Sequence, residues 1–480
     1  ESWQLDEYLV VLFFGGFAAL GLAVRRAREL SREIALREQS EKRERRLARH
    51  DPLTGLVNRR VLTEELNQIM SAIGSETRRC AVFVIDLDHF KPVNDLYGHS
   101  VGDAALVEVA AILREICGSS GLVARLGGDE FVCVISYEDS ELDPARLAGK
   151  VVRRLGRPLE IEGVTLEIGA SVGISIGPVD GTDADALLRA ADVAMYEAKR
   201  DGKARYCFFH AEMDSRLRDR AALETELRGA IPRGEIVAFF QPIIALESQK
   251  IIGFETLARW EHPQRGVLMP DLFIPLAEDI GLIGDICYEM LHQACRAARD
   301  WPPMLSLSVN ISPVQLKDPW MAARILEILT DQGFAPSRLI VEVTESAIIE
   351  DLSQAAKVFS SLHNSGVRIA LDDFGKGYSS LSHLHQLSFD HIKIDGSFIR
   401  SINSSDSKEI VDAIAGLGKS LGMPVTAEGV ETQDCADALR AMGCDQAQGY
   451  FFGRPVNADE TRKLFELSDD SIVEIIKRRA

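Results

Sequence analysis

The chain has 480 residues and a net charge of −19, with 46% hydrophobic and 26% charged residues. This length corresponds to roughly two to four domains, and the composition is typical of globular domains with substantial cores. The negative charge argues against nucleic-acid binding over most of the chain, but it allows a phosphorylated small ligand held through a metal ion. The eight cysteines form no CxxC pair or Cys/His cluster, which predicts reduced, mostly buried thiols in a cytoplasmic protein.

The N-terminal segment, 1–24, contains an uncharged apolar run over 9–24. Trp3 and Tyr8 before the run and Arg25-Arg26 after it favour a transmembrane helix whose C-terminal flank faces the cytoplasm. A signal peptide would carry its positive charge before the run and is disfavoured. The alternative is a buried core helix, because the run of 16 residues is shorter than the roughly 20 that span a bilayer.

The following segment, 25–50, is rich in Glu and Arg and contains no Pro or Gly. Its thin apolar stripe of Leu30, Ile34 and Leu47 predicts an exposed signalling helix. Two interpretations remain open, namely a short parallel coiled coil between two chains and a single solvated helix.

Residues 51–209 are predicted to form a first folded domain of mixed helices and strands. The apolar run 80–88 reads as a strand that ends in acids, and the runs around Gly127-Gly128 read as a hairpin. Two strand–helix units whose strands must pair predict a ferredoxin-like palm. Adjacent strands of such a sheet would bring together carboxylates that bind Mg²⁺ for nucleotidyl transfer. These are Asp86, Asp129 and Glu130.

Three motifs of this domain, "DPLTGLVNRR", "IDLDHFKPVNDLYGHSVGD" and "RLGGDEF", resemble the GGDEF domain of the diguanylate cyclase family. The family joins two GTP molecules into cyclic di-GMP, with one GTP on each subunit of a dimer. The resemblance implies that Asp86 and Glu130 hold one or two Mg²⁺ or Mn²⁺ ions, with Asp129 as a further ligand or a base.

The same resemblance assigns the nucleotide contacts. Asn94 and Asp103 would read the guanine edge. Three lysines would neutralise the triphosphate, with Lys91 counted among the catalytic residues; they are Lys91, Lys199 and Lys203. The family's usual Gly-Arg-Asn is Gly202-Lys203-Ala204 here, which weakens the assignment of Lys203.

A second departure concerns product inhibition. Many cyclases carry Arg-x-x-Asp five residues before the GGDEF motif as an inhibitory product site. The corresponding residues here are Gly118-Ser119-Ser120-Gly121, so no guanidinium or carboxylate remains to bind product. Feedback inhibition through this site is expected to be absent.

A charged linker helix, 210–221, is predicted to lead into a second domain, 222–475. Strands and helices alternate there over about 250 residues, the usual length of a (β/α)₈ barrel. Buried parallel strands are nearly all apolar, so polar residues at successive strand ends predict one functional rim. These residues are Glu255, Asn310, Glu342, Glu345, Asp372, Asp373, Lys393, Glu428 and Gln448.

Carboxylates and an asparagine form hard oxygen sites, suited to two Mg²⁺ or Mn²⁺ ions. Adjacent Asp372-Asp373 could serve both ions. Two metals roughly 4 Å apart can activate a water and stabilise the leaving alkoxide of a phosphodiester. Lys393 could orient that water or neutralise charge on the phosphate.

The second domain resembles the EAL family of cyclic di-GMP phosphodiesterases through "FFQPII", "LDDFGKGYSSLSHL", "IKID", "AEGVE" and "QGYFFGRP". The resemblance implies two metal ions, whose ligands are Glu255, Asn310, Glu342 and Asp372 for one, and Asp372, Asp373 and Glu428 for the other. It also implies that Lys393 and Glu428 form the catalytic pair. Gln241, Arg259 and Gln448 would contact the substrate, and Glu345 would brace the loop after Asp373. The name motif departs to Glu255-Thr256-Leu257, which is expected to tune the site without abolishing it.

Together, these features predict an α/β multidomain protein of the bacterial inner membrane. Its N-terminal helix would anchor a homodimer whose catalytic domains lie in the cytoplasm, and no nucleic acid would be bound. Three hypotheses remain open. In the first, both domains are active, so that cyclic di-GMP is made from GTP and cleaved to pGpG. In the second, only the phosphodiesterase works, and the GGDEF domain binds GTP as a regulator; in the third, both sites are receptors that signal by contact.

Overall fold

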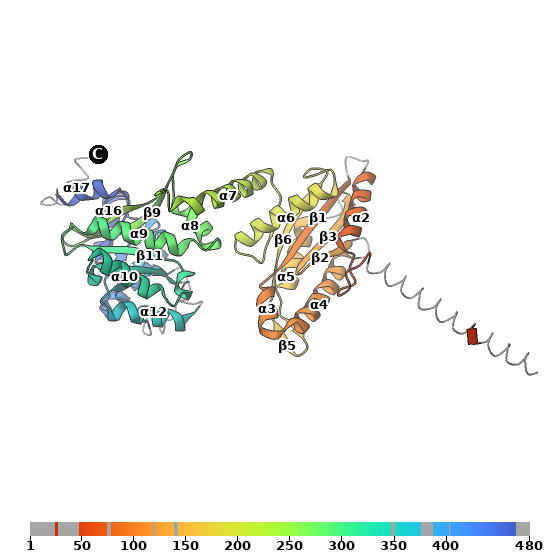
Figure 1. Ribbon diagram of the computed structural model, residues 1–480, viewed down its shortest axis with the longest axis horizontal. Coiled ribbons are helices and arrows are strands. Elements are labelled where there is room, and N and C mark those ends of the chain that lie inside the picture. Colours follow the sequence, from red (N-terminus) through yellow and green to blue (C-terminus); the bar gives the residue numbers. More distant parts are fainter. Residues whose placement is uncertain are drawn as a thin grey trace, which may run out of the picture. The chain divides into compact units, whose positions relative to one another are not determined.

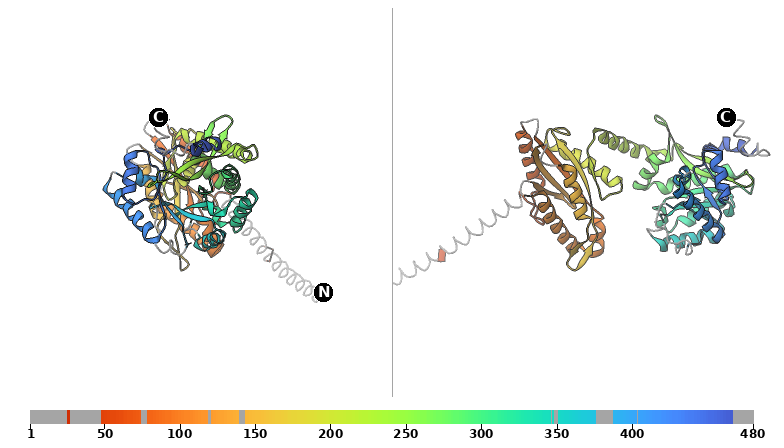
Figure 2. Two further views of the ribbon diagram at one scale, coloured as in Figure 1. Left: turned by 90° about the vertical axis from the view of Figure 1, so that its left-hand side faces the viewer. Right: turned by 180° about the vertical axis from the view of Figure 1, so that it is seen from behind.

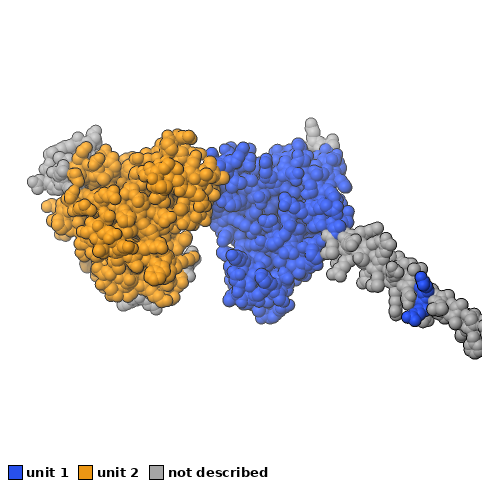
Figure 3. All heavy atoms as spheres, in the orientation of Figure 1, with its two compact units in different colours: residues 1–219 blue, residues 220–480 orange. Residues whose placement is uncertain are grey.

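The computed structural model describes residues 25–26, 48–73, 78–118, 121–138, 143–345, 347, 351–375, 387–402 and 404–466. The chain divides into two compact units, Glu1–Asp219 and Arg220–Ala480 (Figure 3). Helix α7 (Ala211–Ala230) contains the division between them. Most of the predicted signalling helix lies outside the described residues.

The predicted location in the bacterial inner membrane requires correction. No helix within the described ranges is long and apolar enough to cross a bilayer. The run 9–24, on which the prediction rested, lies outside the described residues. Its 16 residues also fall short of the roughly 20 that a spanning helix needs. The membrane assignment is therefore withdrawn.

The first unit contains a five-stranded sheet with the order β2-β3-β1-β6-β7. Its strands are β1 (Arg78–Asp88), β2 (Leu122–Gly127), β3 (Glu130–Glu138), β6 (Gly169–Gly177) and β7 (Tyr206–Phe208), beside a small hairpin of β4 (Leu159–Ile161) and β5 (Val164–Leu166). Only β6 and β7 pair in parallel. Helices flank the sheet in Figures 1 and 2; they are α2 (Arg59–Ala72), α3 (Phe90–Tyr97), α4 (His99–Cys117), α5 (Pro144–Leu155) and α6 (Ala184–Arg200).

Strand β1 is buried on both faces, which explains its continuous apolar sequence. Phe83 and Ile85 pack in one cluster with α4 and α5, whereas Val82 and Val84 pack with α2 and α6. Because side chains alternate along a strand, Asp86 continues the face of Val82 and Val84. The sequence thereby places this carboxylate beside α6.

The second unit closes into a barrel with the strand order β9-β11-β12-β13-β14-β15-β16-β8, since β8 also pairs with β9. These strands are β8 (Ile236–Ala245), β9 (Ile251–His262), β11 (Ser306–Ile311), β12 (Leu339–Thr344), β13 (Arg368–Phe374), β14 (His391–Ile394), β15 (Val425–Ala427) and β16 (Gln446–Ala447). Strand β10 (Gly266–Leu268) pairs antiparallel with the end of β9.

The predicted barrel-like α/β fold is confirmed, with one difference in strand direction. Strand β8 runs antiparallel to both of its neighbours, β9 and β16. A short turn joins β8 to β9, and such a connection can only produce an antiparallel pair. The remaining strands pair in parallel from β9 to β16.

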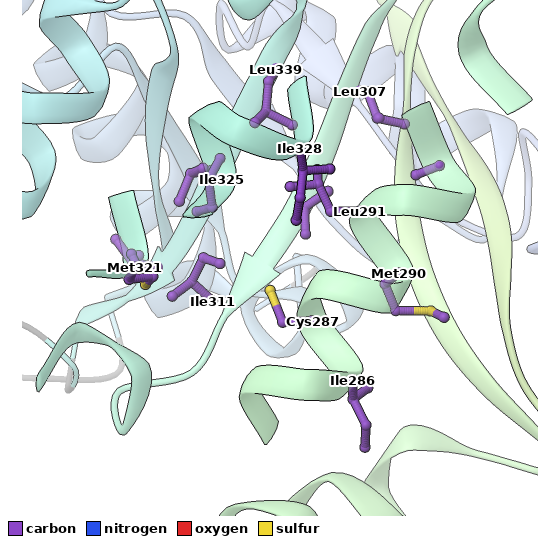
Figure 4. Packing of buried hydrophobic residues seen from close by; sticks show 14 of the residues in the cluster. Ile286, Cys287, Met290, Leu291, Leu307, Ile311, Met321, Ile325, Ile328 and Leu339 are labelled. Atoms are coloured by element: carbon purple, nitrogen blue, oxygen red, sulfur yellow. The ribbon is translucent and has the colours of Figure 1, made fainter. Parts of the chain in front are cut away.

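Helices surround the barrel (Figure 1), and α9 illustrates why they stay there. Ile286, Met290 and Leu291 recur at helical spacing and belong to one buried cluster with Leu307 of β11 and Ile325 of α10 (Figure 4). The helices of this unit are α8 (Pro270–Asp279), α9 (Ile283–Ala298), α10 (Met321–Gln332), α12 (Leu352–Asn364), α14 (Gly396–Arg400), α15 (Ser405–Leu421), α16 (Gln433–Ala441) and α17 (Ala458–Glu466), with short 3₁₀ turns at Gln315–Lys317 and Pro336–Arg338.

Candidate active sites

The strand register brings polar residues to one rim of the barrel. Asn310 of β11 lies opposite Glu342 of β12, and Gln241 of β8 lies opposite Glu255 of β9. Asp372 lies near the end of β13, opposite Thr344. Because parallel strands end at the same face of a barrel, these side chains gather there.

Lys393 of β14 lies at the centre of this group, with its side chain almost completely buried. Its Nζ is 2.5 Å from Glu342 Oε2 and 2.6 Å from Glu428 Oε1. The same nitrogen is 3.6 Å from both Glu255 Oε2 and Asp372 Oδ1. One ammonium therefore faces four carboxylates.

The cluster contains more negative charge than Lys393 can neutralise. Burial raises the pKa of Glu342 well above its usual value and raises the pKa of Glu428 to about 8. Burial opposes the charge of Lys393, but the surrounding carboxylates hold its pKa well above normal. A buried site of this kind favours additional positive charge.

Side-chain amides fix the position of Glu255. Asn310 Nδ2 donates to Glu255 Oε1 at 2.6 Å, and Gln448 Nε2 donates to Glu255 Oε2 at 2.6 Å. Gln448 Nε2 also lies 3.0 Å from Gln241 Oε1, and Gln241 Nε2 donates to the Gly453 carbonyl. Despite burial, Lys393 and these amides hold the pKa of Glu255 below its usual value. The carboxylate is thus kept charged and oriented.

The donors fit a hard divalent cation, although their present arrangement is organised around Lys393. Within the described ranges, no three His, Cys, Asp or Glu side chains form a group able to hold a metal ion. The cluster nevertheless offers carboxylate and amide oxygens, the ligands that Mg²⁺ and Mn²⁺ prefer. Four carboxylates surround one ammonium, and burial raises the pKa of two of them, Glu342 and Glu428.

Three other residues predicted at this rim have different surroundings. Asp373 has a φ of 56°, and its backbone N–H donates to Asp372 Oδ1 at 2.9 Å. Glu345 is buried, and neither carboxylate oxygen has a hydrogen bond among the described residues. The segment 376–386, part of the loop that Glu345 would brace, lies outside the described residues. Arg259 donates to the Ala258 carbonyl and lies over the Phe239 ring, and it is not part of the cavity wall.

A cavity of about 450 Å³ adjoins the carboxylates. Its wall includes Glu255, Asn310, Asp372, Glu428 and Gln448, and it also includes four residues that sequence reasoning missed, namely Asp395, Arg400, Glu431 and Tyr450. Glu431 and Tyr450 belong to the "AEGVE" and "QGYFFGRP" motifs. Their closeness in sequence to Glu428 and Gln448 is the signal that could have placed them at the cavity. Arg400 lies seven residues after Lys393 and carried no such signal.

Thr256, the departure in the name motif, faces a different space. It lines a second cavity of about 340 Å³ whose wall is formed mainly by α8, α9 and the end of β11. Its hydroxyl is buried without a hydrogen-bond partner among the described residues. Because neighbours on a strand point to opposite faces, this hydroxyl points away from the carboxylate of Glu255.

The second candidate site lies on the sheet of the first unit. Asp86 of β1 is directly opposite Glu130 of β3. Lys199 of α6 places Nζ 2.7 Å from Asp86 Oδ2. Burial raises the pKa of both carboxyls, and nearby Asp129 adds to each increase. Asp86 and Glu130, with the charge of Asp129 nearby, form a second concentration of negative charge, and carboxylate oxygens are ligands that hard cations prefer.

The Gly127-Gly128 turn is held by a residue that sequence reasoning missed. Arg125 donates two hydrogen bonds to the Gly128 carbonyl, at 3.0 and 2.6 Å, and one to Asp51 Oδ1 at 3.2 Å. Gly127 and Gly128 have φ values of 150° and 52°, and a Cβ on either would meet no atom within 4 Å. The glycines therefore permit the turn and leave open space in front of it.

The residues predicted to bind the nucleotide are only partly gathered. Asn94 of α3 is close to the start of α4, since a Cβ on Gly102 would lie 2.0 Å from Asn94 Oδ1, and Asp103 is the next residue. Lys91 and Lys203 are exposed. Beside Lys203, the N–H of Ala204 donates to Asp88 Oδ2 at 2.9 Å. Lys199 is the predicted lysine that contacts the carboxylate group among the described residues.

Comparison with known proteins agrees with this domain order. The model of the diguanylate cyclase GGDEF domain matches residues 48–205, and the EAL domain model matches residues 224–455. The bifunctional diguanylate cyclase/cyclic di-GMP phosphodiesterase MucR of Pseudomonas aeruginosa is 40% identical over 86% of this chain and 61% of its own length.

Further similarities extend along both domains. An uncharacterized protein of Mycobacterium bovis is 36% identical over 90% of this chain and 70% of its own. The S helix–GGDEF–EAL structure of Vibrio cholerae LapD, bound to c-di-GMP, shares the fold at 17% identity, with a TM-score of 0.57 over 87% of this chain and 99% of that one. The chain spans about half the length of several curated relatives that it matches. It belongs to the family of proteins that carry a GGDEF domain followed by an EAL domain.

Proposed function

We propose that this chain turns over cyclic di-GMP. Its EAL domain would hydrolyse the cyclic dinucleotide to linear pGpG, and its GGDEF domain would condense two GTP molecules. The observation that carries the proposal is the position of Lys393, within 2.5–3.6 Å of four carboxylates beside a cavity of about 450 Å³. The domain order and the similarity to MucR support it.

In the EAL domain, Glu255, Asn310, Glu342 and Asp372 would hold one Mg²⁺ or Mn²⁺ ion, and Asp372, Asp373 and Glu428 would hold the second. When bound, these ions supply charge stabilisation and a water of lowered pKa. Lys393 neutralises charge on the phosphate. Glu428 Oε1, which lies 2.6 Å from Lys393 Nζ, is placed to exchange a proton with it. Gln241 and Gln448 orient Glu255 and border the substrate. Arg259 is the third proposed substrate contact, and it would have to leave the Phe239 ring to reach the cavity.

In the GGDEF domain, Asp86 and Glu130 would hold one or two ions of the same kind. Asp129 would accept the proton of the attacking hydroxyl or complete the ligand set. The other roles fall to the nucleotide contacts: Asn94 and Asp103 for guanine, and Lys91, Lys199 and Lys203 for the triphosphate. Condensation also needs a second GTP, so synthesis would require a homodimer with two such sites facing each other.

Two reactions with purified protein test the proposal. Labelled GTP and labelled cyclic di-GMP are incubated separately with Mg²⁺, and the products are separated by chromatography. Appearance of pGpG supports the EAL assignment, and appearance of cyclic di-GMP supports the GGDEF assignment. Cleavage without synthesis would favour a GTP-binding regulatory GGDEF domain, while binding without either reaction would favour a receptor.

Removal of divalent metal should abolish cleavage. EDTA is expected to reduce pGpG formation to background, because the buried carboxylates then lack the cations that balance them. Excess Mg²⁺ or Mn²⁺ should restore the rate, whereas excess Ca²⁺ at the same ionic strength controls for non-specific charge effects. Undiminished cleavage in EDTA would contradict the two-metal assignment.

Synthesis of cyclic di-GMP should not be inhibited by its product at residues 118–121. Gly118 has a φ of 67°, and a Cβ on Gly121 would lie 2.7 Å from Cys117 Cβ, so neither position suits a long charged side chain. With degradation blocked by Glu255→Gln, cyclic di-GMP at about 10 μM is expected to leave initial synthesis unchanged. Strong inhibition that Gly118→Ala removes would contradict this prediction.

A further inference from the structure

Arg400 ends helix α14 and lines the cavity beside the carboxylates. Among the described residues, its guanidinium has no hydrogen bond or ion pair. By contrast, Lys393 on the same rim is surrounded by carboxylates. A guanidinium carries five N–H donors in a rigid fork. Arg400 therefore presents unused donors at the wall of a cavity that can hold a ligand.

Two glycines determine where this guanidinium lies. A Cβ on Gly396 would be 3.0 Å from Arg400 Nη1, and a Cβ on Gly429 would be 3.4 Å from the same atom. Gly429 has a φ of 70° and directly follows Glu428. Because Gly396 and Gly429 carry no side chain, there is room for the Arg400 guanidinium next to Glu428, a member of the proposed catalytic pair.

The surroundings of Arg400 suit a planar heterocycle better than a phosphate. Glu431 and Tyr450 line the same cavity; Tyr450 is 53% exposed as a residue, and the Arg454 guanidinium lies 4.3 Å from the centroid of its ring. Glu431 offers acceptor oxygens, and an exposed aromatic ring offers a stacking surface for a base. The phosphate, in contrast, belongs beside Lys393 and the carboxylates.

We propose that Arg400 reads a guanine base of the cyclic dinucleotide and determines its specificity over adenine; this inference rests on the proposed function of the EAL domain. Guanine presents two acceptors, O6 and N7, on one edge, whereas adenine presents N7 beside an amino donor. A guanidinium fork matches both acceptors of guanine. Against adenine, one of its N–H groups meets another donor.

Equilibrium binding tests this role separately from catalysis. Cyclic di-GMP and cyclic di-AMP are titrated calorimetrically into the full chain with Ca²⁺ in place of Mg²⁺, and each sample is then analysed for cleavage. Arg400→Met is compared with the wild type and with Arg462→Met. Arg462 is a partly exposed arginine of the same unit that pairs with Asp300 and is not part of the cavity wall. Thermal unfolding verifies that the variants are folded.

Arg400→Met is expected to weaken cyclic di-GMP binding by about 10- to 100-fold, the range of a lost bidentate base contact. Its cyclic di-AMP binding and both affinities of Arg462→Met should match the wild type. Equal weakening of both dinucleotides, unchanged binding, or no binding by the wild type would overturn the inference. If the wild type shows the Arg400-dependent preference but never cleaves with Mg²⁺, the inference stands and the proposed hydrolysis fails.

Discussion

Glu255→Gln is expected to lower the rate of cyclic di-GMP cleavage by about 1,000-fold or more. The amide keeps the size of the side chain but removes a charge from the proposed metal site. Metal ions supply several kcal/mol of transition-state stabilisation, and each 1.36 kcal/mol corresponds to a tenfold change in rate. The measurement is the initial rate of pGpG formation at saturating Mg²⁺.

Glu278→Gln is the matched control for this loss. Glu278 is a half-buried carboxylate of the same unit that accepts a hydrogen bond from Ser312 and faces the other cavity. The Glu278→Gln variant should cleave cyclic di-GMP at the wild-type rate. Stabilisation by Mg²⁺ gives a second measure, because an ion that binds only the folded state raises the unfolding temperature. This rise should be smaller in Glu255→Gln, and near-normal cleavage by that variant would contradict the role of Glu255 as a ligand.

In the second unit, the sequence pattern predicted the barrel and the polar residues that gather at its rim. Glu255, Asn310 and Glu342 stand out in otherwise apolar strands, and parallel register alone carries them to a common rim. The antiparallel direction of β8 follows from a turn length that the alternation of strands and helices does not reveal. The central place of Lys393 among four carboxylates depends on side-chain packing across strands far apart in sequence, which no local pattern contains.

Residues that act through backbone geometry were the hardest to predict. Arg125 holds the Gly127-Gly128 turn through a carbonyl, and nothing in its own spacing signals such a bond. Arg400 owes its position to two glycines in separate segments, Gly396 and Gly429. Thr256 could be read as a neighbour of Glu255 along the chain, but alternation along β9 turns it toward α8 and α9.

The double substitution Asp129→Asn with Glu130→Gln is expected to abolish synthesis of cyclic di-GMP from GTP. The amides keep size and hydrogen bonding, and the turn itself depends on Gly127, Gly128 and Arg125. What they remove is the charge that would hold a hard cation opposite Asp86. Radiolabelled GTP turnover measures the effect, while cleavage of cyclic di-GMP without GTP should remain at the wild-type rate.

Glu138→Gln, at the other end of β3, is the control and should behave as the wild type in both reactions. GTP dependence of cleavage separates the two surviving enzyme hypotheses. If GTP accelerates cleavage by the wild type and by Glu138→Gln but not by the double amide, the carboxylates hold a regulatory nucleotide, whether or not synthesis occurs. If the double amide still synthesises cyclic di-GMP, Asp129 and Glu130 merely follow a hairpin, because no metal-dependent condensation could survive the loss of both charges beside Asp86.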